Sequence, residues 1–132
     1  MAQTPSASVV VGNLRFTVRS VHSGVQAVEG DRGSVREPEG KFTVVELYVL
    51  NTGEQKASFY TGAQRLVDTE GAEHMIDAVA TALVETVLDS LKPGEAGDTA
   101  LVYDLPEWVE PLQILLCDTY DRSRRRSVQF VA

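Results

Sequence analysis

Gly40-Lys-Phe-Thr-Val-Val-Glu-Leu-Tyr-Val-Leu-Asn-Thr-Gly53 is the segment of this chain that indicates its fold class most strongly. Apart from Glu46, the run from Phe42 to Leu50 consists of β-branched, aromatic and large aliphatic residues, which is typical of a β-strand. The strand is apolar on both faces, so we expect it to lie centrally in its sheet. Asn51-Thr-Gly53 supplies residues that tolerate positive φ angles and therefore predicts a tight turn.

Several other segments carry the alternating or apolar pattern of short strands. They are residues 14–18, 57–59, 64–68, 73–76, 99–103, 112–117 and 127–131. The segment 29–40 is rich in charge, glycine and proline, which predicts an exposed loop before the long strand. About seven short strands without a βαβ rhythm indicate an all-β, antiparallel two-sheet sandwich.

One segment departs from this pattern and predicts a helix. Apolar residues recur at three- and four-residue intervals from Ile76 to Leu91, and Asp77 is a candidate N-cap. We expect the helix to end before Pro93-Gly94, since proline restricts the residue before it. Just upstream, Asp68-Thr-Glu-Gly71 predicts the turn of a hairpin.

Length and charge bound the organisation and the partners. The 132 residues fit a single domain over residues 13–132, preceded by a small, polar and flexible segment over residues 1–12. The formal net charge of -7 argues against nucleic acid and favours cationic partners. No apolar run is long enough for a membrane span, which argues against direct membrane insertion.

Three motifs, in order, carry a family resemblance. They are Lys41-Phe-Thr-Val-Val-Glu-Leu-Tyr-Val-Leu-Asn-Thr-Gly53, then Leu66-Val-Asp-Thr-Glu-Gly71, then Leu91-Lys-Pro-Gly-Glu95 with Leu101-Val-Tyr-Asp-Leu-Pro106. This order resembles the bacterial domain family of unknown function DUF4352, related to immunoprotective extracellular antigens of mycobacteria. The resemblance implies an immunoglobulin-like sandwich, found outside the cytoplasm, and no established catalytic activity. The one short helical insertion after Ile76 is predicted by the residue spacing and departs from the loop usual in that family.

The conspicuous residues of these motifs have structural roles in turns. Asn51, Gly53, Gly71 and Gly94 shape turns, Pro93 stops the element before it, and Asp68 accepts bonds from backbone donors.

Chemistry-bearing side chains do not form a recognisable catalytic set, cofactor motif or metal motif. Asp68, Glu70, Glu73 and Asp77 offer carboxylates to a cation such as calcium, but their order does not fit an EF-hand, and a solvated acidic turn is the alternative. His74-Met75 with His22 and Cys117 could suggest copper. A surface histidine beside a core methionine, and a buried inert thiol, are the simpler interpretations. We therefore predict no catalytic, cofactor or metal site.

Two features are candidates for protein binding. Arg122-Ser-Arg-Arg-Arg126 places Arg122, Arg124, Arg125 and Arg126 at the tip of a predicted hairpin, where they could dock an acidic partner or pair with neighbouring carboxylates. Trp108, between Pro106 and Pro111, could be an interface anchor or cap one end of the core.

The sequence thus predicts a non-enzymatic, extracytoplasmic module that binds another protein through a sheet edge or through loops 29–40 and 106–111. An intracellular scaffold or regulatory module, and a small-ligand or metal-binding protein, are the alternatives. Residues 1–8 lack the charged and apolar regions of a signal peptide. An extracytoplasmic location therefore requires that a signal segment has been removed, and a cytoplasmic location is expected otherwise. Partner identity and oligomeric state are left open.

Overall fold

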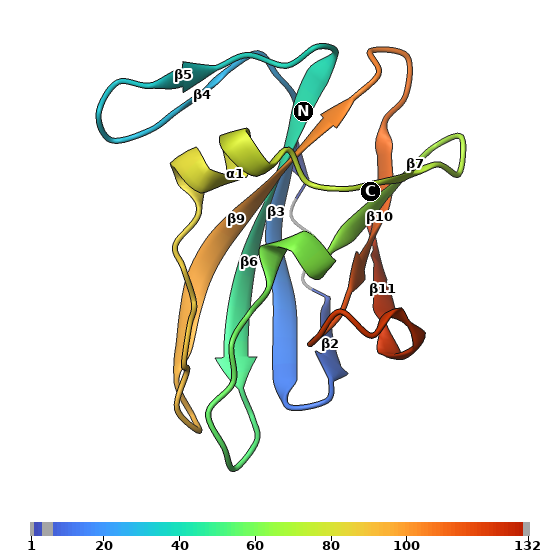
Figure 1. Cartoon of the computed structure of the whole chain (residues 1–132). Helices are drawn as coiled ribbons and strands as arrows, with labels where there is room; N and C mark the ends of the chain where they lie inside the picture. Colours follow the sequence, from blue (N-terminus) through green and yellow to red (C-terminus); the bar gives the residue numbers. More distant parts are fainter. Residues whose placement is uncertain (1, 4–6, 131–132) are drawn as a thin grey trace.

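The long strand is β6 (Lys41–Asn51), and it lies centrally in a sheet, as the sequence predicts (Figure 1). The computed structural model describes residues 2–3 and 7–130. In it β6 pairs antiparallel with β3 (Leu14–Val25) on one side and β9 (Ala96–Leu105) on the other. Two further strands, β1 (Ala2–Gln3) and β2 (Ser8–Val11), pair with β3 and complete this sheet.

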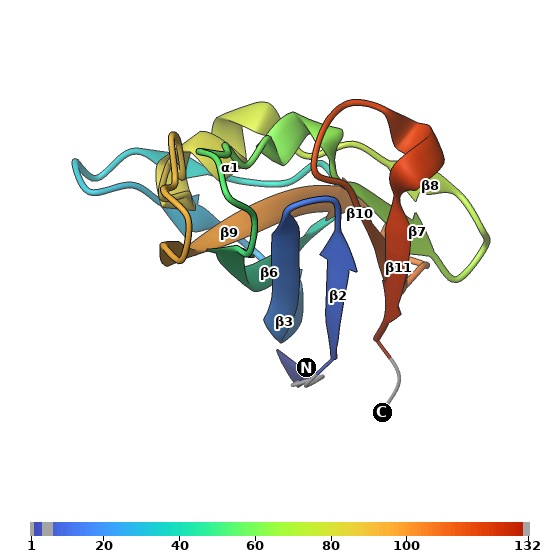
Figure 2. The same cartoon turned by 90° about the horizontal axis from the view of Figure 1, so that it is seen from below.

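A second sheet packs against the first across the core (Figures 1 and 2). Its strands lie in the order β11 (Arg126–Gln129), β10 (Pro111–Leu116), β7 (Arg65–Asp68) and β8 (Glu73–His74), all antiparallel. A small hairpin of β4 (Val28–Glu29) and β5 (Val35–Arg36) forms a separate two-stranded sheet, whose Val28 packs into an apolar cluster with Phe42. The predicted all-β antiparallel sandwich is confirmed, and the seven strands longer than two residues within the described ranges agree with the number expected.

The main core lies between the two sheets. Val45, Leu47 and Val49 of β6 are fully buried there, together with residues from both sheets such as Phe16 and Ile114. Alternate residues of a strand point to opposite faces, so the other apolar side of β6 needs a cover of its own. Phe42 meets Ala80 of α1 (Ala78–Val84) there, in a second, smaller apolar cluster.

The helix begins where the sequence predicts but ends much earlier. The Asp77 side chain caps α1 by accepting from the Ala80 N–H at 3.0 Å. Beyond Val84 the backbone bonds to other segments: Leu88 accepts from the Phe59 N–H, and Leu91 exchanges two bonds with Ala57. Leu88 and Leu91 are therefore buried in a non-helical segment that bonds to Ala57 and Phe59. The helix ends at Val84 for this reason, and Pro93 is too far along the chain to end it.

The turn after β6 is built differently from the prediction. Among the described residues Gly53 is not one of those with positive φ, whereas Gly71 and Gly94 are, both at +85°. Gly53 is needed for space, because an added Cβ would lie 2.6 Å from the Asn13 side chain. Asn51 is fully buried; its amide donates to the carbonyls of Gln55 and Leu91 and accepts from the Gly53 N–H.

Four other predictions need correction. Residues 1–12 are not a flexible segment throughout, because Ser8–Val11 forms β2 and Val11 is buried. The expected strand at 57–59 is reduced to a single bridge between Ala57 and Leu91. The expected loop 29–40 contains β5. Met75 is 64% exposed, while the His74 side chain is only 19% exposed, the reverse of the expected arrangement. Cys117 is buried, as predicted.

Candidate functional site

Two of the predicted binding loops meet at one end of the sandwich and form a hollow. The chain enters β6 through Glu39-Gly40 and leaves β9 through Pro106-Glu-Trp108, and both segments lie beside His74 of β8. The hollow has a volume of about 560 Å³ and is lined by Glu39, Gly40, His74, Asp104, Leu105, Pro106, Glu107 and Trp108. The antiparallel pairing of β6 with β9, which sets Lys41 opposite Leu105, brings these loops together.

One wall of the hollow is fixed by Asp104. Its two carboxylate oxygens accept from the backbone N–H groups of Glu39, at 2.8 Å, and Gly40, at 3.0 Å. Gly40 passes so close to β9 that an added Cβ would lie 2.0 Å from the Leu105 carbonyl oxygen. A glycine is therefore required for this close approach.

The opposite wall is the turn that carries Trp108. Its indole is 77% exposed, while the next residue, Val109, is 1% exposed and anchors the turn in the core. Thr69 and Glu110 exchange two hydrogen bonds, from the Thr69 N–H to the Glu110 carbonyl and from the Glu110 N–H to the Thr69 hydroxyl. The core-capping alternative for Trp108 is thus wrong, and its ring is presented to solvent on an anchored turn.

The Glu110 carboxylate also ties this turn to the base of β6. It pairs with the Lys41 ammonium and accepts from the Ser23 hydroxyl at 2.9 Å. The bond from Lys41, helped by Ser23, outweighs desolvation and lowers the pKa of Glu110. Glu110 is therefore a carboxylate with a structural partner.

Glu39 and Glu107 differ from Glu110 in being free. Both residues are exposed on the rim of the hollow. Neither carboxylate has a hydrogen-bond or ion-pair partner among the described residues 2–3 and 7–130. The hollow therefore combines an exposed aromatic ring with two negative charges that a partner could neutralise.

His74 and Asp68 form a partly buried pair at the base of the hollow. The His74 Nε2 lies 2.7 Å from Asp68 Oδ2, and the other oxygen of Asp68 accepts from the backbone N–H groups of Glu70 and Ala72. Burial alone would raise the pKa of Asp68, but the bonds from His74, Ala72 and Glu70 outweigh it and lower the pKa. The predicted role of Asp68 in its turn is confirmed.

The acidic residues proposed as a cation site do not converge. Asp68 is held by His74, Glu73 forms a two-bond pair with Arg125 at 3.0 and 3.1 Å, and Asp77 caps α1. No cluster of three or more metal-ligating side chains occurs in the part of the chain that the structure describes. The copper alternative likewise has its members apart, since His22 pairs with Glu46 and Cys117 donates to the Asp121 carbonyl.

The arginine run lies in the connection between β10 and β11, as predicted, and its members have different surroundings. Arg125 pairs with Glu73, and Arg124 lies 3.3 Å from Asp118. Arg126 is exposed at the start of β11, and the Arg122 side chain lies outside the described residues. The run follows β10 whereas Trp108 precedes it, so the two predicted binding features lie at opposite ends of that strand.

The sequence pattern indicates Trp108 and the two loops as candidates for binding. It does not indicate that Glu39, Asp104 and His74 line the same hollow as Trp108. Asp104 carries a local signal, because it is a charged residue that follows the apolar run Leu101-Val-Tyr103. Its bonds to residues 39 and 40 depend on the pairing of β6 with β9, which the pattern does not specify.

Comparison with known proteins gives a family and a fold. A family model described as "Domain of unknown function (DUF4352)" matches residues 6–124. Two solved structures align along almost the whole chain. A conserved hypothetical protein from Bacillus anthracis is 16% identical with a TM-score of 0.69, covering 99% of this chain and 96% of that one. The yjhA protein from Bacillus subtilis is 18% identical with a TM-score of 0.68, covering 96% and 98%.

At these identities the likeness concerns the fold alone. A search of curated proteins gives no match. Among the described residues, no helix has the length and apolar character that crossing a membrane requires.

Proposed function

The chain belongs to the DUF4352 family, a domain of unknown function, and from that premise we propose that it is a non-enzymatic module that binds another protein. The bound segment of the partner carries an exposed lysine or arginine, and the hollow beside Trp108 receives it. The observation that carries the proposal is an indole 77% exposed on an anchored turn, next to the unpaired carboxylates of Glu39 and Glu107.

The chemistry of this hollow suits a basic segment. Tryptophan offers the best aromatic face for a lysine or arginine cation. Glu39 and Glu107 add charge attraction, and the formal net charge of -7 favours the approach of a cationic partner. Tryptophan is also enriched among residues that contribute most to protein interfaces.

The walls of the hollow limit the entropic cost of binding. Asp104 holds residues 39 and 40, and Thr69 holds the Trp108 turn. A site whose backbone is already ordered loses less conformational freedom on association. We therefore expect binding without rearrangement of the two loops.

The test uses a photo-crosslinking amino acid at position 106 in the native cell, with position 87 as the control. Pro106 lines the hollow, so the crosslinker lies beside an intact Trp108, whereas Val87 is strongly exposed, at 73%, but does not line the hollow. The partner crosslinked from position 106 is then purified and titrated against the native chain, Trp108→Ala and Val87→Ala. We expect Trp108→Ala to weaken binding about 30-fold or more, as for an interface anchor worth roughly 2 kcal/mol.

Two further substitutions test the contribution of the carboxylates to binding. Glu39→Gln with Glu107→Gln should weaken binding and reduce its dependence on salt. Equal affinity of the partner for the native chain and for Trp108→Ala would contradict the proposal. So would a partner whose bound segment has no lysine or arginine.

The location outside the cytoplasm stays a prediction. It is tested by fractionating cells and probing the native protein in the extracytoplasmic fraction, with a cytoplasmic marker as the control. Recovery with the cytoplasmic marker would favour the scaffold or regulatory alternative.

A further inference from the structure

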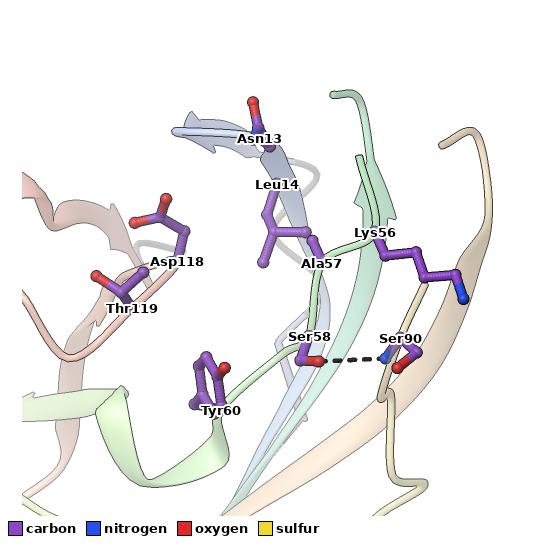
Figure 3. A pocket seen from close by; sticks show the side chains of 9 residues that line it. All are labelled: Asn13, Leu14, Lys56, Ala57, Ser58, Tyr60, Ser90, Asp118 and Thr119. Atoms are coloured by element: carbon purple, nitrogen blue, oxygen red, sulfur yellow. Dashed lines mark hydrogen bonds between the residues drawn. The ribbon is translucent and has the colours of Figure 1, made fainter. Parts of the chain in front are cut away.

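A second hollow lies at the other end of the sandwich, and the protein-binding proposal does not use it (Figure 3). It has a volume of about 410 Å³. Four segments line it: the β2–β3 turn, the segment after β6, Ser90, and the connection after β10. The lining residues that bear on its chemistry are Asn13, Ser58, Tyr60, Ser90, Asp118 and Thr119.

The walls of this hollow are held by specific contacts. The Ser58 hydroxyl accepts from the Ser90 N–H at 3.1 Å and donates to Asp89 at 2.7 Å. Ser90 has a φ of +54° and is the one non-glycine residue with positive φ in the described ranges 2–3 and 7–130. Such a conformation is strained, persists only where surrounding contacts enforce it, and is concentrated at functional sites.

Two exposed tyrosines pack against each other here, and Tyr60 is the one that lines the hollow. Tyr60 and Tyr120 are 43% and 62% exposed, and their rings lie 5.5 Å apart between centroids with an interplanar angle of 42°. The Tyr120 hydroxyl lies close to Gly62, where an added Cβ would be 2.9 Å from it. Tyr60 and Tyr120 also line a smaller hollow of about 180 Å³, so aromatic surface is presented between two depressions.

The polar groups around the tyrosines are mostly uncharged. Hydroxyl and amide side chains predominate, and they come from Asn13, Ser58, Ser90 and Thr119. The charge of Asp118 is offset by Arg124 at 3.3 Å. In Figure 3 the Lys56 side chain extends away from Tyr60 and Asp118. This balance favours neither a strongly anionic nor a strongly cationic ligand.

We propose that the hollow beside Tyr60 and Tyr120 binds a saccharide. A sugar ring presents C–H groups on its face, which suit an aromatic ring, and hydroxyls on its edge, which both donate and accept hydrogen bonds. Tyrosine combines an apolar ring with a polar hydroxyl. Serine and threonine hydroxyls and the asparagine amide also donate and accept. The volume lies within the range of small-molecule pockets.

The test is an NMR titration of the ¹⁵N-labelled full chain with cellobiose, maltose and N,N′-diacetylchitobiose. At least one of them should give saturable shifts at the amides of residues 57–62, 88–90 and 118–120. Tyr60→Ala and Tyr120→Ala should each weaken that binding at least tenfold. Tyr48→Ala is the matched control, since Tyr48 packs against Arg19 on another surface and does not line either hollow.

Further variants separate this proposal from others. Tyr60→Phe keeps the ring and should retain most of the binding, and Trp108→Ala should leave it unchanged, since Trp108 belongs to the other site. Absence of saturable shifts with all three sugars would overturn the proposal. Equal binding by Tyr60→Ala, Tyr120→Ala and the native chain, each verified as folded by its spectrum, would also overturn it.

Discussion

Replacing Asn51 by alanine should destabilise the protein by about 3 kcal/mol. The fully buried Asn51 amide donates to the Gln55 carbonyl at 2.8 Å and the Leu91 carbonyl at 2.9 Å, and accepts from the Gly53 N–H at 2.9 Å. A hydrogen bond of this kind contributes about 1 kcal/mol net, and a buried group left without a partner costs about as much or more. Three bonds lost together give the estimate.

Equilibrium unfolding in urea measures this loss. With a slope of about 2 kcal/mol per molar urea, the midpoint should fall by roughly 1.5 M. Glu54→Ala, an exposed change in the same loop, is the control and should alter stability by less than about 0.5 kcal/mol. Asn51→Asp should be at least as damaging as Asn51→Ala at neutral pH, because it places a carboxylate against two carbonyl oxygens.

An Asn51→Ala midpoint no lower than that of Glu54→Ala would contradict the stabilising role of the Asn51 amide. It would mean that the three bonds are replaced by bonds to water at no net cost. A changed slope with an unchanged midpoint would instead indicate an altered denatured state.

Three other outcomes are expected. Because the pKa of Asp68 is lowered in the fold, its contribution to stability is present above the unfolded pKa of about 3.9 and is lost as pH falls through the lowered folded pKa. Urea titrations at several pH values should therefore show that the stability of Asp68→Asn depends less steeply on acid pH than that of the native chain. An unchanged acid dependence would contradict the assignment. Trp108 is the only tryptophan, so the native chain should show red-shifted emission that acrylamide quenches readily, and a blue-shifted, protected emission would refute its exposure. Burial raises the pKa of Tyr103, whose hydroxyl has no hydrogen-bond partner among the described residues. Tyr103→Phe should therefore raise the free energy of unfolding by about 1 kcal/mol, whereas a clear loss would show that the hydroxyl is bonded.

Much of the fold follows from local pattern. The apolar run 42–50 is the central strand because both of its faces are apolar. Asp68-Thr-Glu-Gly71 is a hairpin turn because the Asp68 carboxylate accepts hydrogen bonds from backbone N–H groups of the same turn. Both features depend on neighbours close in the chain, which periodicity and turn chemistry capture.

The helix after Asp77 shows where local pattern stops. The spacing from Ile76 to Leu91 suits a helix, and the cap at Asp77 is real. Ala57 and Phe59 nevertheless take the backbone bonds of residues 88 and 91, and this long-range pairing overrides helical propensity.

The two hollows show the same limit for function. Trp108 was recognisable as a candidate because it is a lone tryptophan between prolines, but its exposure depends on Val109 being the residue that enters the core. Tyr60 and Tyr120 lie sixty positions apart in the sequence, and no local signal predicts their contact.

Side-chain periodicity and backbone freedom at single residues are enough to predict the strand class, the central position of residues 41–51, and the turns at Asp68 and Gly94. The folded arrangement is needed to know which loops share an end of the sandwich, which carboxylates remain unpaired, and which aromatic rings face solvent. Those properties arise from strand pairing between distant segments, and the register between β6 and β9 places Glu39 beside Trp108. Local pattern therefore encodes the strands and turns of this chain, whereas the extent of its helix and its candidate binding sites depend on contacts that only folding creates.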